Sequence, residues 1–275
     1  MQDMYKIAER QKEIYDSVDK YAAFAEILPE YNIPLKQMDG QVVWMYWNDK
    51  RLIPKIVKRC IENVQRHVDR NIVLLTDNTV QEYVNLPVYV WEKYRNGVIT
   101  PTHFSDLVRV ALLAVYGGTW IDATVYLTGD IPNRYLDCEL CMVRGDTWRQ
   151  YEIQKFICCS SWFISACSGN EFITAVRNAL YGYWISEEEL KEYYLIHIII
   201  ARLLDENTDY KQQWINMPFL SSQDAHYLNS IQYQKFDDTK WNEIKEVSFM
   251  HKLSYKAKVG DFESYYKKIM RNEIE

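Results

Sequence analysis

Apolar and polar positions recur along the chain with the periods of both strands and helices. Apolar runs of strand length occupy residues 41–47 and 71–76, and residues 54–68 between them place apolar side chains on one helical face. Later, residues 138–143 and 156–166 have the pattern of strands, and residues 171–184 and 186–205 that of helices. A short helix is expected at 79–84. Because the run at 71–76 is apolar without interruption from Ile72 to Leu75, this succession of strands and helices predicts a parallel sheet covered on both faces.

Residues 100–130 form the most informative stretch. Thr100 and Pro101 have the properties of a helix N-cap and of the first helical residue. Residues 107–116 are apolar except for Arg109, so the helix they predict is buried on most sides. Gly117 and Gly118 are expected to end that helix with positive φ. Residues 119–126 then have the β-branched and aromatic composition of one strand.

Polar residues interrupt this apolar unit in two places. Thr102, Ser105, Asp106 and Arg109 share one face of the predicted helix. In the following strand, Asp122 stands among apolar neighbours, where an unpaired carboxylate would cost several kcal/mol. It therefore needs a partner, a cation or a bound ligand. The pattern leaves two explanations open, an internal ion pair with Arg109 or a binding site.

Composition narrows the classes of partner. The 275 residues include 22 tyrosines and 9 tryptophans, which suit stacking on bases or sugars but also fill cores. The formal net charge of −6 argues against nucleic acid as the main partner. No signal-peptide pattern or membrane-length apolar run occurs, so a cytoplasmic protein is expected. The amphipathic pattern of residues 4–28 predicts a helix docked on the surface rather than a lipid anchor.

Cysteine and histidine give weak signals for metal. Cys138 and Cys141 form a CxxC pair, but no second pair follows at zinc-ribbon spacing, so all six cysteines are expected to be reduced thiols. His197 lies in a fully apolar helical stretch and is predicted to be a core residue. Residues 249–258 concentrate positive charge in an acidic protein, as a binding segment or as ordinary surface lysines.

Motifs for nucleotides are absent from the predicted sheet. Neither GxGxxG nor GxxxxGK[ST] occurs. Asp77, however, directly follows the strand at 71–76, at the carboxyl edge where open α/β sheets bind ligands.

The order of these motifs resembles a known group of enzymes. The first strand with its tryptophans, IVLLTD at 72–77, FSDLVRVALLAVYGGTWIDATV at 104–125 and HKLSYK at 251–256 are similar to glycosyltransferases with a DXD motif. They resemble more closely the bacterial capsular polysaccharide synthesis proteins near glycosyltransferase family 32. The resemblance is detailed over residues 41–135 and in the tail, and general over 136–245.

The resemblance implies an α/β fold of the GT-A type, a Rossmann-like nucleotide-sugar-binding fold with a mixed central sheet and added helices. Residues 1–34 would form an N-terminal helical segment, and residues 35–275 the catalytic domain. Within that domain, 136–245 would add acceptor-side helices and strands, and 246–275 a basic tail.

The resemblance also implies roles for single residues. In such enzymes an Asp and an Arg one turn apart grip the donor sugar, and Asp106 and Arg109 match that pair. Asp122 matches the first DXD aspartate, while Thr124 replaces the second. Together these residues imply a divalent cation, Mn²⁺ or Mg²⁺, on the donor diphosphate, held by Asp122 and by His251 of the tail.

The rest of the donor would meet residues at the first strand, the second strand and the tail. Trp44 or Trp47 would stack on the base, and Asp77 would reach the nucleoside. Lys252 and Lys256 would neutralise the departing diphosphate.

The expected activity is retaining transfer from a nucleotide diphosphate sugar, a UDP-sugar, to a growing capsular or other surface polysaccharide. The acceptor would be a glycan or a lipid-linked oligosaccharide, met transiently at the inner face of the membrane. Two alternatives remain open. A phosphatase of the HAD type would need a second carboxylate where Thr124 stands, whereas a non-catalytic nucleotide-sugar-binding protein would not need an intact DXD motif.

Overall fold

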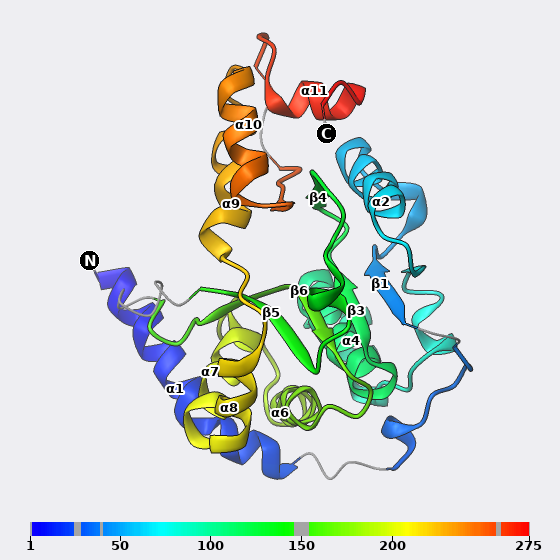
Figure 1. The fold of residues 1–275 in the computed structure, drawn as a ribbon. Helices are drawn as coiled ribbons and strands as arrows, with labels where there is room; N and C mark the ends of the chain where they lie inside the picture. Colours follow the sequence, from blue (N-terminus) through cyan, green and yellow to red (C-terminus); the bar gives the residue numbers. More distant parts are fainter. Residues whose placement is uncertain (1, 25–28, 39–40, 146–153, 257–259, 275) are drawn as a thin grey trace.

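The protein consists of a central sheet, helices packed on both of its faces, and an extension built from the later part of the chain (Figure 1). The computed structural model describes residues 2–24, 29–38, 41–145, 154–256 and 260–274. The elements follow in the order α1 (Gln2–Phe24), η1 (Pro29–Asn32), β1 (Val42–Tyr46), η2 (Lys50–Leu52), α2 (Lys55–His67), β2 (Asn71–Leu75), η3 (Val80–Glu82), α3 (Val88–Arg95), α4 (Pro101–Tyr116), β3 (Gly118–Ile121), β4 (Val125–Leu127), α5 (Asn133–Leu136), β5 (Leu140–Arg144), β6 (Cys159–Ala166), α6 (Glu171–Ser186), α7 (Leu195–Glu206), α8 (Thr208–Asn216), α9 (Ser222–Ile231), α10 (Asp238–Val247), β7 (Met250–Lys252) and α11 (Tyr265–Arg271).

The central sheet is mixed, which confirms the fold class expected from the sequence. Among the described residues, five strands pair in the order β2-β1-β3-β6-β5. β1 runs parallel to β2 and to β3, whereas β6 is antiparallel to β3 and β5. Because β1 and β3 are parallel, their carboxyl ends, at Tyr46 and Ile121, meet at one edge of the sheet. Open α/β sheets bind ligands at such an edge.

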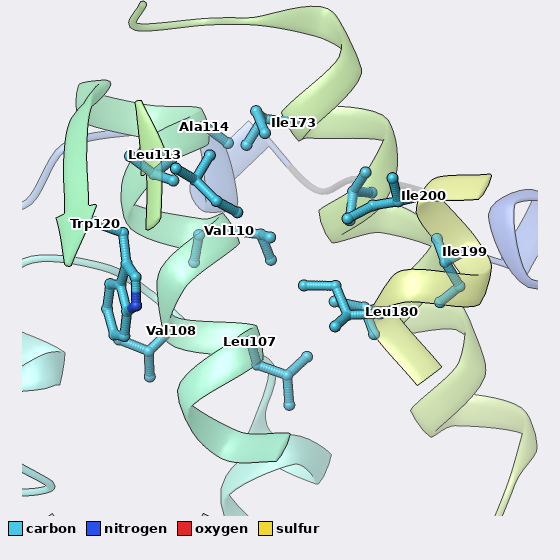
Figure 2. Packing of buried hydrophobic residues seen from close by; sticks show 14 of the residues in the cluster. Leu107, Val108, Val110, Leu113, Ala114, Trp120, Ile173, Leu180, Ile199 and Ile200 are labelled. Atoms are coloured by element: carbon cyan, nitrogen blue, oxygen red, sulfur yellow. The ribbon is translucent and has the colours of Figure 1, made fainter. Parts of the chain in front are cut away.

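Two clusters of buried side chains cover the two faces of this sheet. Alternate residues of β1 enter different clusters, Trp44 on one face and Val43 on the other. On the face of Trp44, α4 packs against α6, which packs in turn against α7, and Figure 2 shows Leu107 of α4 across from Leu180 and Ile199. On the opposite face lie α2, β4 and the last three helices described, α9, α10 and α11. The sheet is therefore the middle layer of the molecule.

Local sequence explains the helix and strand at the centre. The Thr100 side chain accepts a hydrogen bond from the His103 backbone N–H, and Pro101 occupies the first turn of α4. Gly117 and Gly118 end the helix with φ of 67° and 86°, as predicted. A Cβ atom on Gly118 would lie 2.2 Å from the carbonyl oxygen of Val42, so only glycine lets β3 start beside β1.

The first helix is docked on the surface of the central unit, as its amphipathic pattern predicts. α1 packs against α6 and α7 and buries Ile14, Val18 and Tyr21. The two backbones cross closely at Gly182 of α6, where a Cβ atom would lie 1.7 Å from the Tyr21 carbonyl oxygen. The predicted end of this helix, at residues 25–28, lies outside the described residues.

A small second sheet joins the middle of the chain to its later part. β4 and β7 are antiparallel, and Val125 pairs with Lys252. On its other side β4 pairs with no strand of the described residues. There Asn63 of α2 hydrogen-bonds Leu127, with its Nδ2 2.9 Å from the carbonyl oxygen and its Oδ1 2.6 Å from the backbone nitrogen. α9 packs on β7. The segment 250–252 is therefore fixed directly beside the segment that follows Asp122.

Three sequence-based predictions differ from this structure. The strand predicted at 119–126 is wrong as a single element, because a turn at Asp122–Thr124 divides it into β3 and β4, in different sheets. The helix predicted from residue 186 begins only at Leu195. β2 is not covered on both faces, since it is an edge strand with half-buried residues at 72–74.

Other sequence-based predictions agree with the structure. None of the six cysteines forms a disulfide bond, and four of them are buried. Within the described ranges, no helix combines the length and apolarity needed to cross a bilayer. The strands predicted at 138–143 and 156–166 are present as β5 and as the shorter β6.

Candidate functional site

A cavity of about 520 Å³ opens at the carboxyl ends of β1 and β3. Its wall is built from the ends of these strands, the first turns of α4, the start of β6, the segment before α7 and the tail after β7. This volume falls within the range of small-molecule sites, and the position is the one expected for ligands of an α/β sheet.

The polar face of α4 forms one wall of the cavity. Thr102, Ser105, Asp106 and Arg109 all line it, as their helical spacing predicts. Asp106 and Arg109 are ion-paired with each other, and their side chains are only 9% and 3% exposed. The deeper part of this face is therefore rigid and charged, while the Thr102 and Ser105 end is more open.

Asp122 is held by three donors at the bottom of the cavity. Its Oδ1 accepts hydrogen bonds from Arg109 Nη2 at 2.9 Å and from Trp120 Nε1 at 2.8 Å. Its Oδ2 lies 2.7 Å from Lys252 Nζ. The internal Asp–Arg pair considered from the sequence is thus present, and it lines the cavity as well.

The two carboxylates of this cluster differ in electrostatics. Burial favours the neutral form of Asp122, but the charges of Lys252 and Arg109 outweigh burial and lower its pKa to about 2. Burial raises the pKa of Asp106, and Arg109 opposes that effect only in part. Arg109 is shared by both groups, so the second cation, Lys252, accounts for the lower pKa of Asp122.

Thr124 and Lys252 complete the cluster. The Lys252 ammonium also lies 2.5 Å from the Thr124 hydroxyl oxygen. The backbone N–H of Leu253 donates to the Thr124 carbonyl oxygen at 2.9 Å, which fixes the register between tail and turn. Asp122 and Thr124 lie at the turn after β3 and not on one face of a strand. They are nevertheless brought together by the same lysine.

The structure does not bring His251, the predicted metal ligand, to the cavity. Successive residues of β7 point to opposite sides, so His251 is directed away from the cavity that Lys252 enters. Its ring is fully buried, with Nε2 3.1 Å from the Thr128 hydroxyl oxygen. Burial lowers the pKa of His251 to about 4, so this imidazole is neutral.

The side chains around Asp122 do not fit the metal site implied by the resemblance. Both carboxylate oxygens and the Thr124 hydroxyl face the cationic groups of Arg109 and Lys252. In the described parts of the chain, no three His, Cys, Asp or Glu side chains lie together as metal ligands would. A dication at this point would meet a guanidinium and an ammonium instead of a second carboxylate.

Aromatic residues form the outer part of the cavity, and here one of the two predicted tryptophans is excluded. Trp44 is fully buried and donates through Nε1 to the Gly117 carbonyl oxygen at 2.9 Å, so it does not reach the cavity. Trp47 does line it, in an edge-to-face contact with Tyr255 at 5.5 Å between ring centroids. Lys256 also lines the cavity. Together with the two rings it makes the mouth of the site aromatic and positively charged.

Asp77 lies behind the wall rather than in it. Its carboxylate accepts hydrogen bonds from the hydroxyl groups of Tyr46 and Tyr94, the latter at 2.9 Å. Tyr46 lines the cavity and Asp77 does not. The predicted direct contact with a nucleoside is therefore replaced by a supporting position, in which Asp77 orients Tyr46.

The position of His197 differs from the one predicted from the sequence. It lies on α7, as predicted, but lines the cavity instead of the core. Its Nδ1 is buried with no hydrogen-bond partner among the described residues. Burial, with Arg109 adding to the effect, lowers the pKa of His197 to about 3 and keeps the imidazole neutral. A polar residue inside a wholly apolar helical run was the available signal.

Other lining residues were not singled out from the sequence. Trp120 precedes Asp122 by two positions and donates to its carboxylate from near the end of β3. Tyr255 lies inside the HKLSYK tail. Tyr193 and Tyr194 lie in the stretch between α6 and α7, where a helix had been predicted, so nothing in the pattern marked them.

The cavity has the opposite charge balance to the whole chain. Among the described residues that line it, Arg109, Lys252 and Lys256 stand against two carboxylates, in a protein of formal net charge −6. Such a site favours an anionic ligand with a flat ring and hydrogen-bonding groups.

The chain is similar to known proteins over different parts of its length. A region of 156 residues is 27% identical to "Glycosyltransferase afumC" of Aspergillus fumigatus (strain CBS 144.89 / FGSC A1163 / CEA10), covering 48% of this chain but only 36% of that relative. The solved structure of "PaToxG Glycosyltransferase" is 14% identical over 78% of this chain and 84% of its own, with a TM-score of 0.40. A family profile described as "Capsular polysaccharide synthesis protein" matches residues 4–269. The chain belongs to the capsular polysaccharide synthesis protein family.

Proposed function

We propose that the protein is a retaining glycosyltransferase that moves a sugar from a nucleotide diphosphate sugar, a UDP-sugar, to a growing capsular or other surface polysaccharide. The observation that carries this proposal is the cationic, aromatic-walled cavity at the carboxyl edge of β1 and β3. The family's description and the name of the fungal relative support it.

The donor fits this cavity with its base at the mouth. Trp47 and Tyr255 offer two aromatic surfaces for the base. Lys252, deeper in the cavity, and Lys256, at its mouth, are suited to the diphosphate oxygens. The sugar then lies toward α4, next to Asp106 and Arg109.

The sugar would be oriented by groups that are already held in place. Asp106 and Arg109 are fixed by their ion pair, so hydrogen bonds to sugar hydroxyls need little further ordering. The neutral imidazole of His197 can both donate and accept, and its Nδ1 has no protein partner among the described residues. These contacts would select the sugar.

Transfer exchanges one bond to the anomeric carbon for another. The bond to the diphosphate oxygen breaks, a bond to the acceptor hydroxyl oxygen forms, and the hydroxyl proton leaves with the nucleoside diphosphate. Negative charge grows on the leaving oxygen, where Lys252 stabilises it. Among the described lining residues, both carboxylates are bound to Arg109, which favours attack from the face of the leaving group over a covalent enzyme intermediate.

The acceptor would enter from the side of Tyr193 and Tyr194, which are 58% and 37% exposed and line the cavity. Exposed aromatic rings suit the apolar faces of sugars. We place this acceptor, a glycan or a lipid-linked oligosaccharide, at the cytoplasmic face of the membrane, in transient contact with the protein.

The test is release of nucleoside diphosphate from a panel of UDP-sugars, with oligosaccharide acceptors and with Arg109→Ala as the inactive control. Retention is checked from the anomeric configuration of the product by NMR. Donor binding without turnover for any acceptor would favour the alternative, a non-catalytic nucleotide-sugar-binding protein. Absence of both binding and turnover would refute the proposal.

A further inference from the structure

We propose that Lys252 takes the place of a divalent cation, so that the protein binds the diphosphate of its donor without metal. This inference rests on the proposed function, because it concerns how the same cavity holds a nucleoside diphosphate. The observation that carries it is the position of the Lys252 ammonium, 2.7 Å from Asp122 Oδ2 and 2.5 Å from Thr124 Oγ1.

The ammonium lies where a cation bound by these two residues would lie. A metal shared by Asp122 and Thr124 would need the oxygens that Lys252 now contacts. The other oxygen of Asp122 already accepts from Arg109 and Trp120. A dication could enter only by displacing the ammonium, and it would then stand close to two positive side chains.

Charges balance without a metal. Asp106 and Asp122 supply two negative charges, and Arg109 and Lys252 two positive ones, all within one chain of contacts. A second carboxylate at position 124 would leave an excess of negative charge that a dication could neutralise. The threonine there removes that excess, so the lysine is sufficient.

Lys252 is built into the site rather than placed on a mobile surface. Its residue is fixed by pairing with Val125 in the β4–β7 sheet and by the hydrogen bond from Leu253 to Thr124. Its side chain is only 21% exposed. An ammonium has three donors, and the described contacts use two of them. The third remains for a phosphate oxygen, which lysine binds as a point charge.

The first test measures binding of UDP by calorimetry to the metal-stripped full chain, in EDTA and in excess Mn²⁺. The dissociation constant should agree within about twofold in the two conditions. Lys252→Met should weaken binding about ten- to hundredfold, the loss of one charge-assisted contact. Lys252→Arg, which keeps the charge, should lose less. Lys245→Met removes an exposed lysine of α10 and should bind as the wild type does.

Two results would overturn the inference. One is UDP binding by the wild type that appears only with Mn²⁺. The other is a Lys252→Met protein that is folded and binds UDP like the wild type. The wild-type arm does not depend on the variant, so a Lys252→Met protein that fails to fold leaves the test intact.

Turnover of UDP-sugars separates this inference from the proposed function. Transfer that persists in EDTA supports both. Transfer that needs Mn²⁺ keeps the proposed function and refutes the role of Lys252. No transfer under either condition, with UDP bound equally in both, keeps the metal-free site and refutes the enzyme.

Discussion

Replacement of Asp122 by asparagine tests the charged cluster most directly. Asparagine has nearly the same shape, but it carries no charge and directs one NH₂ group toward donors. In the wild type the carboxylate accepts from Arg109, Trp120 and Lys252. In the variant, the NH₂ group of asparagine must therefore face at least one of these donors, and Lys252 loses its counter-charge.

The pKa of Asp122 gives the size of the effect. It is lowered from 3.8 to about 2, and this shift corresponds to about 2 kcal/mol of folding free energy. The side chain is 25% exposed, so solvent screening reduces this figure only modestly. Because the pKa is lowered, the stabilisation is fully present above the unfolded value near 4 and is lost as the pH falls toward 2.

The assay is urea unfolding followed by tryptophan fluorescence. Asp122→Asn should lower the free energy of unfolding by about 2 kcal/mol, equally at pH 5 and pH 8. Asp130→Asn is the matched control, because that side chain is 85% exposed and pairs only with His67 among the described ion pairs. It should change stability by no more than about 0.5 kcal/mol. A cost for Asp122→Asn that shrinks between pH 8 and pH 5 would refute the lowered pKa.

Three further predictions concern other parts of the structure. His197→Leu should slow transfer about tenfold while leaving stability equal or higher, because it removes the proposed contact to the sugar and a buried nitrogen that has no partner among the described residues. Stopped assays and thermal melts measure the two effects. Gly182→Ala should destabilise the fold by about 1–3 kcal/mol in urea, since its Cβ would overlap the Tyr21 carbonyl. Thr124→Asp combined with Lys252→Met should create Mn²⁺-dependent stabilisation by UDP, because it supplies a second carboxylate and removes the ammonium.

Each of these has an outcome that contradicts it. His197 is only a packing residue if the leucine variant melts earlier and transfers at the wild-type rate. For Gly182→Ala the control is Gly129→Ala, whose Cβ would lie 3.9 Å from the nearest side-chain atom, and equal stability of the two variants argues against the close helix crossing. A double variant whose melting temperature ignores Mn²⁺ contradicts the account of why Lys252 excludes metal.

The centre of the site was predictable because its signals are local. The spacing of Asp106 and Arg109 places them one turn apart on any helix, and Gly117 and Gly118 mark where that helix must end. A carboxylate such as Asp122 among apolar residues indicates a partner or a ligand, because burying it unpaired would cost free energy. These inferences need no knowledge of which distant segments meet.

The errors about the site concern contacts between distant segments. The turn after Asp122 exists because β4 leaves the central sheet to pair with β7, and no local pattern records that switch. The same pairing decides that Lys252 enters the cavity and His251 faces away. His197 likewise looked like a core residue because helical periodicity does not show that a cavity adjoins α7.

The pairing of β4 with β7 also sets the order in which the site is completed during synthesis. Asp122 and Lys252 are separated by 130 residues, and a ribosome adds them on the order of ten seconds apart. β1, β3 and α4 can therefore associate long before the strand that carries the lysine exists. Until that strand docks, Asp122 has Arg109 but not its second cation. The proposed anion-binding site is in this way withheld from every unfinished chain, and binding of a nucleoside diphosphate would report that β7 is in place.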